Sequence, residues 1–338
     1  MTLRHRPMQP RDLRPCVEKI ASDPVRLARY GNAIEDLQPA WLRLLQCEAK
    51  SAVVFEEVDG SRATLCGIGV SAFVNDDFMC ELKAQPRWYG PELARRLRRG
   101  DSPILSDRQL REANSRGGLN AVVWEAFICP GFETNLDVYR KMGAAFIEEH
   151  LGFFWKELLA HQVDTVDRLH WVLQTGGLVW DPIAGRYTDL SEKDPAEIVN
   201  APHVFGLTRE VDMRRPGSWM GILFEYRPPQ FGFSPAEQRL LLAALRGGTD
   251  RELSEALGIS LATVKKTWRS VYVRVAAHSP DLIPANSATN GDEAMPERGR
   301  EKKHPLIAYL REHPEELRPF SRKPLKAESH APVRQEAS

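Results

Sequence analysis

Three cationic side chains on one predicted helix, Lys265, Lys266 and Arg269, are the residues of this chain best suited to bind a polyanion. No acidic residue occurs between Leu261 and Ala277. At about 100° per residue, the cations fall on the side opposite an apolar stripe. That stripe consists of Val264, Trp268, Val271 and Val275. A helix with one apolar and one cationic face suits the major groove of DNA, where Lys and Arg reach phosphates and guanine edges.

The residues before this helix predict the elements that position it. Ser234-Pro235-Ala236-Glu237 and Thr249-Asp250-Arg251-Glu252 are capping boxes, each of which begins a helix. Gly258 suits a left-handed turn, and Ser260 can cap the third helix. A run of charges alone is more simply the solvated face of a core helix. Three short helices joined by such turns instead predict a helix-turn-helix.

This stretch resembles the C-terminal DNA-binding domain of LuxR-type (GerE-type) transcription regulators. The resemblance is confined to residues 233–275 and leaves the rest of the chain unassigned. The combined motif is specific rather than a short chance match. The matching residues are Ser234, Pro235, Glu237, Gly248, Asp250, Glu252, Leu253, Leu257, Gly258, Ile259, Ser260, Thr263, Val264 and Lys265.

The resemblance implies roles for four side chains. The three cations take the family's groove-facing positions, and Thr263 lies near the DNA backbone at the start of the recognition helix, 261–277. Two positions depart from the family pattern, because Thr267 stands where His is frequent and Ser270 where Asn is common. The base preference is therefore open.

A second departure from the family lies after the recognition helix. The family's fourth helix, which commonly forms the dimer contact, should follow at once. Residues 279–303 are instead rich in Pro, Asn, Ser, Gly and charge, which predicts a flexible insert. Residues 305–312 are expected to be the displaced fourth helix, with Leu306, Ile307 and Leu310 on its apolar side. We expect a homodimer, and a disordered tail over residues 321–338.

The first 230 residues predict an α+β domain with a largely antiparallel sheet. Asp59-Gly60 joins two strands in a hairpin, and Pro130-Gly131 ends a buried strand. Expected strands span 2–8, 51–58, 63–74, 119–128, 169–173, 204–211 and 219–226. Expected helices span 10–21, 40–47, 91–99, 107–115 and 135–160, the last being the longest.

The order of these elements also resembles the start of a GNAT-type acyltransferase, beginning at Leu3–Pro7 and Pro10–Leu13. That family binds the pyrophosphate of coenzyme A with a glycine-rich loop between strand and helix. The corresponding residues, Ile128–Asn135, read ICPGFETN and lack this pattern, so the main anchor of the coenzyme is missing. An acyltransferase-like enzyme with a docking helix-turn-helix is the alternative function. A promoter-reading module like that of sigma factors is a third.

Composition limits the remaining function classes. The chain has 338 residues with 46 basic and 46 acidic side chains, and residues 234–277 carry seven basic and four acidic ones. The chain as a whole is therefore neutral, and the predicted DNA-binding segment has a small excess of positive charge. Five widely spaced cysteines without a CxxC pattern predict free thiols in a reducing cytoplasm. No apolar signal core or membrane-length run is present.

No catalytic residue, metal site or cofactor is predicted. His150 and His161, eleven residues apart, are more simply solvated or core histidines than metal ligands. Seven of the eight tryptophans lie in the first 230 residues, where core filling is the simpler interpretation and an aromatic effector pocket the other. The expected partner is double-stranded DNA, with RNA polymerase and a small-molecule effector left open and no membrane.

Overall fold

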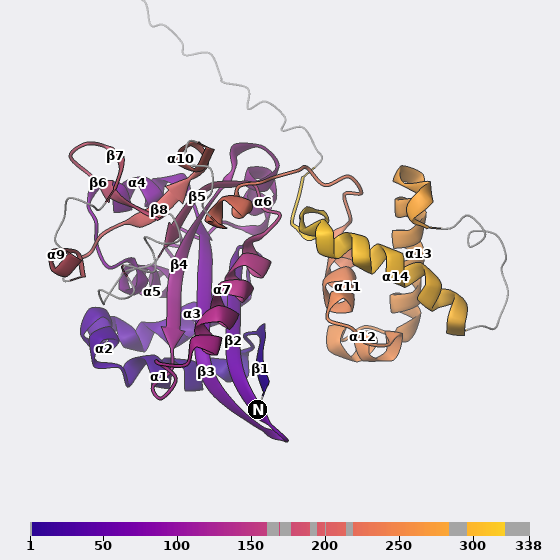
Figure 1. Cartoon of the computed structure of the whole chain (residues 1–338), viewed down its shortest axis with the longest axis horizontal. Helices are drawn as coiled ribbons and strands as arrows, with labels where there is room; N and C mark the ends of the chain where they lie inside the picture. Colours follow the sequence, from indigo (N-terminus) through magenta and orange to yellow (C-terminus); the bar gives the residue numbers. More distant parts are fainter. Residues whose placement is uncertain are drawn as a thin grey trace, which may run out of the picture.

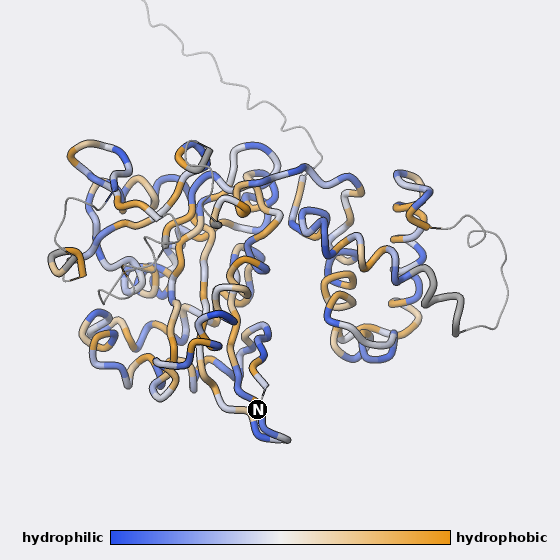
Figure 2. The backbone as a smooth tube through the Cα atoms, in the orientation of Figure 1, coloured by the Kyte–Doolittle hydropathy of each residue, from blue (hydrophilic) through white to orange (hydrophobic). Residues whose placement is uncertain are grey.

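The computed structural model has two lobes, one built on a sheet and one whose described residues form helices, and each lobe has apolar clusters of its own (Figure 1). The sheet lobe lies within residues 2–230, and the helical lobe comprises residues 231–283 and 296–312. Apolar segments run along the central strands and along the first helix of the helical lobe (Figure 2). The structure describes residues 2–160, 169, 177–189, 195–199, 201–213, 219–283 and 296–321.

The sheet lobe is α+β, as predicted, and its described residues form a sheet of eight strands in the order β1-β2-β3-β4-β5-β8-β6-β7. Its neighbouring strands pair antiparallel except for β4 and β5, which are parallel and joined through helix α7. The strands are β1 (Thr2–Pro7), β2 (Lys50–Asp59), β3 (Arg62–Val74), β4 (Leu119–Ile128), β5 (Trp155–Ala160), β6 (Leu178–Asp181), β7 (Arg186–Thr188) and β8 (Phe205–Thr208).

Both faces of the central strands are covered. Successive side chains of a strand point to opposite faces, and along β2 Val53 and Phe55 join one apolar cluster while Val54 joins another. The first cluster includes Val138 and Ala145 of α7, and the second contains residues of α1, α3 and α5. The sheet is therefore the middle of three layers, which explains why its central strands, β2, β3 and β4, are buried over most of their length.

The helices cover these faces and complete the helical lobe. In the sheet lobe they are α1 (Leu13–Ala21), α2 (Pro24–Tyr30), α3 (Ile34–Leu45), α4 (Asp76–Ala84), α5 (Tyr89–Arg99), α6 (Asp107–Glu112), α7 (Leu136–His150), α9 (Pro195–Val199) and α10 (Arg209–Met213). In the helical lobe they are α11 (Pro235–Leu245), α12 (Asp250–Leu257), α13 (Leu261–His278) and α14 (Pro296–Glu312).

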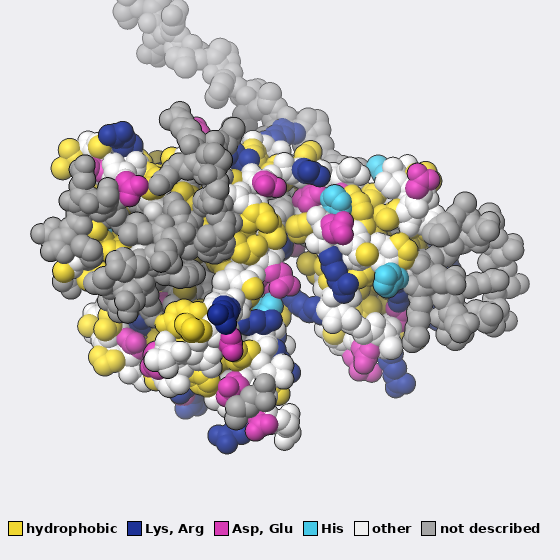
Figure 3. Space-filling model, in the orientation of Figure 1, with side chains coloured by type: hydrophobic (Ala, Val, Ile, Leu, Met, Phe, Trp, Pro, Cys, Tyr) yellow, Lys and Arg dark blue, Asp and Glu magenta, His cyan; other side chains and the backbone are white. Residues whose placement is uncertain are grey.

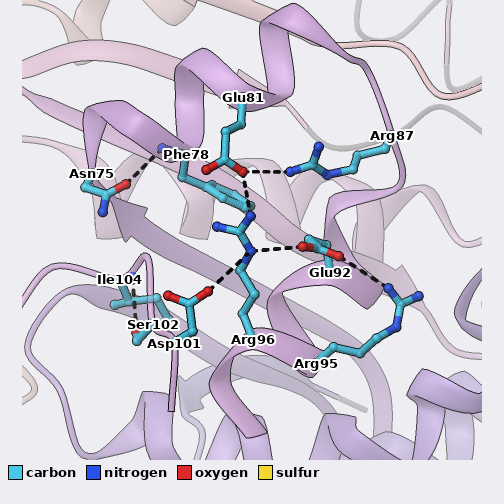
Figure 4. Close-up of polar contacts among 10 residues, drawn as sticks. All are labelled: Asn75, Phe78, Glu81, Arg87, Glu92, Arg95, Arg96, Asp101, Ser102 and Ile104. Carbon is cyan, nitrogen blue, oxygen red and sulfur yellow. Dashed lines mark hydrogen bonds and ion pairs between the residues drawn. The ribbon is translucent and has the colours of Figure 1, made fainter. Parts of the chain in front are cut away.

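A network of ion pairs joins α4 to α5 (Figure 4). Arg96 of α5 donates to Glu81 of α4 at 2.5 Å and to Glu92 of its own helix at 2.9 Å. Arg87 also pairs with Glu81, and Asn75 caps α4 by accepting the N–H of Phe78. Arg96 therefore bridges the two helices, and the carboxylate of Glu81 is shared between Arg96 and Arg87.

Several predicted elements differ in the structure. The helix expected over 135–160 ends at His150, because Gly152 turns the backbone to φ +81° and the aromatic-rich segment after it forms β5. The strand expected over 219–226 is a 3-10 turn at Trp219–Leu223. The strand expected over 204–211 is shortened to β8 by α10. The strand expected over 169–173 lies, apart from residue 169, outside the described residues.

Most of the placed tryptophans fill the core. Trp41, Trp124 and Trp155 are each at most 1% exposed, and Trp41 meets Trp124 edge to face. The predicted core role is therefore confirmed for these three side chains. The side chains of residues 171 and 219 are outside the described part of the chain. Acidic, basic and apolar side chains are interspersed over the face seen in Figure 3, in keeping with the zero formal charge.

His150 is a buried imidazole at the end of α7. Its ring lies among Phe73, Phe146 and Trp155, and Nδ1 is 2.7 Å from the carbonyl oxygen of Phe146. Burial lowers the pKa of His150 to about 4. The folded protein thus keeps a neutral ring at pH values where the unfolded chain binds a proton.

We therefore expect stability to fall as the pH drops below about 6.5, the pKa of an unfolded histidine. Between pH 7.5 and 5.0 the free energy of unfolding should decrease by about 2 kcal/mol through this group, since one pKa unit corresponds to about 1.4 kcal/mol. His150→Phe keeps an aromatic ring and removes the titration. Urea unfolding of both proteins at the two pH values measures the difference, and an equal pH dependence in both would refute it.

Candidate nucleic-acid interface

The three predicted helix starts are formed by the residues expected to cap them. Ser234 accepts the N–H of Glu237, and the Glu237 carboxylate accepts the N–H of Ser234 at 2.7 Å. Thr249 and Glu252 form the same reciprocal pair at the start of α12. Each box satisfies amide groups that the first turn of a helix leaves without partners. The start of each helix is therefore determined by residues within a few positions of it in sequence.

The turn between α12 and α13 also has the expected geometry. Gly258 ends α12 with a left-handed backbone, φ +64° and ψ +30°. Ser260 then caps α13 by accepting the N–H of Thr263 at 3.1 Å. The hydroxyl of Ser254 reaches forward to the carbonyl of Ile259 and closes the turn. These contacts fix where α13 begins and the angle at which it leaves α12.

The apolar stripe of α13 faces the core of the helical lobe. Val264, Val271 and Val275 have no exposed surface, and Trp268 is 3% exposed. They share one cluster with residues of the other three helices. The predicted burial of this stripe is confirmed, and it determines which side of α13 is turned to solvent. The partner residues in that cluster include Leu240, Leu241, Leu253, Leu306 and Leu310.

The opposite side of α13 carries the candidate site. Lys265, Lys266, Arg269 and Thr263 are all exposed, so the structure brings the four predicted residues together on one accessible face. Among the described residues, none of the three cations takes part in an ion pair with a carboxylate. Thr263 shares a hydrogen bond of 2.8 Å with the hydroxyl of Ser260. The face therefore offers cationic side chains to an external anion.

Glu237 has a second role that the sequence did not reveal. Its carboxylate accepts hydrogen bonds from Ser270 at 2.7 Å and from Arg274 at 3.1 Å, both on α13. The side chain is 3% exposed. Burial acts to raise the pKa of Glu237, but the hydrogen bonds from Ser270 and Ser234 and the charge of Arg274 hold it below its usual value. This carboxylate locks the rotation of α13 against α11.

The predicted insert, 279–303, is described only at its two ends. Residues 280–282 form a 3-10 turn, α14 begins at Pro296, and residues 284–295 lie outside the described part of the chain. The ammonium of Lys303 pairs with Asp250 and lies 4.8 Å from the Trp268 ring centre. As predicted, Leu306 and Leu310 face inward, and α14 closes the apolar core over α13.

In the loop between β4 and α7, the N–H groups of Gly131, Phe132 and Asn135 already have partners within the loop. The N–H of Gly131 donates to the carboxylate of Glu133 at 2.7 Å. The side-chain oxygen of Asn135 accepts the N–H groups of Asp137 and Val138 at the start of α7. A carboxylate at this position repels a pyrophosphate. This carboxylate is a second argument, beside the missing glycine-rich pattern, against binding of a pyrophosphate at this loop.

Among the described residues no cluster of His, Cys, Asp and Glu has the arrangement of a metal site. His150 is buried in an aromatic cluster, and residue 161 lies outside the described part. None of the described helices combines the length and apolarity needed to cross a bilayer. Comparison with family models, curated proteins and solved structures found no match to this chain.

Proposed function

We propose that this chain is a cytoplasmic, DNA-binding transcription regulator of the LuxR type, with α13 as the recognition helix. One observation carries the proposal: α13 buries its apolar stripe completely and leaves Lys265, Lys266 and Arg269 exposed beside Thr263. A major groove about 12 Å wide admits such a helix. The capping of α13 and its hydrogen bond to Glu237 hold the helix that carries the cations in one orientation before DNA arrives. Such preorganisation lowers the entropic cost of binding.

The proposal is tested by removing one cation at a time. Lys265→Ala and Arg269→Ala should each weaken binding to a duplex by about 1–3 kcal/mol if the side chain reads a base. If the side chain neutralises a phosphate, the slope of log binding constant against log salt concentration should become shallower by about one unit, because one counterion fewer is released. Duplexes selected by the full chain from a randomised pool supply the probe, and fluorescence anisotropy across salt concentrations gives both quantities.

Arg62→Ala is the matched control, because Arg62 is an exposed arginine at the start of β3 in the other lobe. It changes the net charge by the same amount and leaves α13 untouched. Affinities of Lys265→Ala and Arg269→Ala that equal that of Arg62→Ala would remove the DNA-reading assignment.

We infer that the sheet lobe is the input or dimerisation module. The strand order, with one parallel β4–β5 pair connected through α7, supports the likeness to GNAT-type acyltransferases in fold. The occupied N–H of Gly131 and the Glu133 carboxylate that accepts from it argue against coenzyme A binding and favour a scaffold that binds another effector or a second copy. On α14 the exposed side chains include His304, Ala308 and Arg311, a mostly polar stripe. This composition favours a homodimer formed through the sheet lobe over one formed through α14.

A further inference from the structure

A short segment after α14 contacts both lobes. Residues 314–321 leave the helical lobe through a 3-10 turn, Pro314–Leu317, and reach the end of α7 in the sheet lobe. We call residues 314–321 the clasp segment. In sequence it is rich in proline and charge and carries no motif. Its polar groups form hydrogen bonds with residues of both lobes.

Arg318 is bonded on both sides. Its guanidinium donates to the carbonyl oxygens of Leu151 at 2.7 Å and Glu148 at 2.9 Å. The central carbon of the guanidinium, Cζ, lies 4.6 Å from the ring centre of Phe153. Its own carbonyl oxygen accepts from Gln238 of α11 at 2.8 Å. One residue therefore links the end of α7 to the first helix of the helical lobe.

Glu316 ties the connection between the lobes to the clasp segment. Its carboxylate accepts the backbone N–H groups of Gln230 at 2.6 Å and Phe231 at 3.0 Å, and the residue is 1% exposed. Hydrogen bonds from amides to a buried carboxylate are charge-assisted and stronger than neutral ones. The chain connection between the two lobes, at Gln230 and Phe231, is thus hydrogen-bonded to the clasp segment.

The sheet lobe has a fitted seat for this segment. Asn114 is 1% exposed, donates to the carbonyl of Pro319 at 2.7 Å and accepts the N–H of Phe154 at 2.7 Å. Ser115 accepts the N–H of Ser321 at 2.7 Å. At Gly152 a Cβ atom would lie 2.4 Å from the backbone nitrogen of Glu315, so any side chain there would displace the segment.

We propose that the clasp segment fixes the orientation of the DNA-reading helix α13 relative to the sheet lobe, and that its release is a regulatory step in DNA binding. The second half rests on the proposed function. The cations of α13 are exposed while the segment is seated, so the segment sets orientation and does not cover the site. Orientation matters because two copies on DNA must place their recognition helices about 34 Å, or one helical turn, apart.

The first experiment measures the distance between the lobes in the full chain. Spin labels are placed on Cys80, which is exposed on α4, and on an introduced Ala256→Cys in α12, with half-buried Cys47 replaced by serine. Double electron–electron resonance should give one narrow distance distribution. Gly152→Ala should broaden it, because the added methyl displaces the segment.

Gly100→Ala is the matched control. Gly100 also follows a helix and has φ +84°, against +81° at Gly152, but no atom lies within 4 Å of the position that a methyl group would take there. Both substitutions place alanine at a similar positive φ, which L side chains rarely adopt, and only one collides with the clasp segment. Arg318→Ala provides a second release that leaves both glycines intact. Circular dichroism checks that each variant is folded.

The proposal is overturned if the distribution of the unsubstituted chain is already broad, or if it is unchanged in both Gly152→Ala and Arg318→Ala. On a duplex selected by the unsubstituted chain, Gly152→Ala should bind at least about fivefold more weakly than Gly100→Ala, the low end of typical couplings between sites. Equal affinities would overturn the regulatory half. If the unsubstituted chain binds no duplex, the proposed function fails, whereas the distance measurement still decides the clasp.

Discussion

Trp268→Ala is expected to unfold the helical lobe and abolish duplex binding, although Lys265, Lys266 and Arg269 remain in place. The indole is 3% exposed and sits at the centre of the stripe that orients α13. Truncating a buried tryptophan typically costs about 3–5 kcal/mol through lost contacts and the cavity left behind. A small lobe has little stability to lose, since whole domains are stable by only about 5–15 kcal/mol.

The measurement combines urea unfolding with duplex binding by anisotropy. Trp268→Phe is the control, because it keeps an aromatic ring in the same core and should retain most of the affinity. The sheet lobe should still show its own unfolding transition in Trp268→Ala, which separates local from global loss. Affinity of Trp268→Ala within twofold of the unsubstituted chain would show that the orientation of α13 does not depend on this core.

The starts of α11, α12 and α13 and the buried stripe of α13 can be predicted from local sequence, because their signals are local. Each cap lies within three residues of the amide that it satisfies, and the stripe of α13 repeats at helical spacing. The hairpin of β2 and β3 was predicted for the same reason, since Gly60 turns the chain with φ +59° between two apolar runs. The order of the strands in the sheet, by contrast, came only from the structure.

The errors lie where contacts distant in sequence decide the outcome. Residues 153–159 continue an apolar pattern from α7, but Gly152 ends the helix and Trp155 pairs beside Leu119 in a parallel strand. Glu237 was recognised as a cap, yet its bonds to Ser270 and Arg274 span more than thirty residues. Ser270, noted as a departure from the family pattern, was the one available signal. The clasp segment had none, because the hydrogen-bond partners of Glu316 and Arg318 lie more than 75 residues away in sequence.

Glu125→Ala is expected to destabilise the sheet lobe by about 3–5 kcal/mol, the usual cost of breaking a buried ion pair from one side. Glu125 of β4 has no exposed surface and accepts from Arg26 of α2 at 3.3 Å and from the hydroxyl of Tyr30 at 2.8 Å. Burial and the nearby carboxylate raise the pKa of Tyr30 far above its usual value, so the hydroxyl stays a donor. Without Glu125, both groups lose this acceptor inside the core.

A matched comparison tests whether burial of the ion pair causes the expected loss of stability in Glu125→Ala. Glu18→Ala removes the carboxylate of an exposed pair, in which Arg14 lies 2.8 Å from Glu18 on the surface of α1. Exposed pairs contribute little because water screens them, so this variant should be nearly neutral. Glu125→Gln, which keeps an acceptor for Tyr30 and loses the charge, should lie between the two. Urea unfolding followed by circular dichroism measures all three, and equal losses for Glu125→Ala and Glu18→Ala would contradict a structural role for the buried pair in holding α2 against β4.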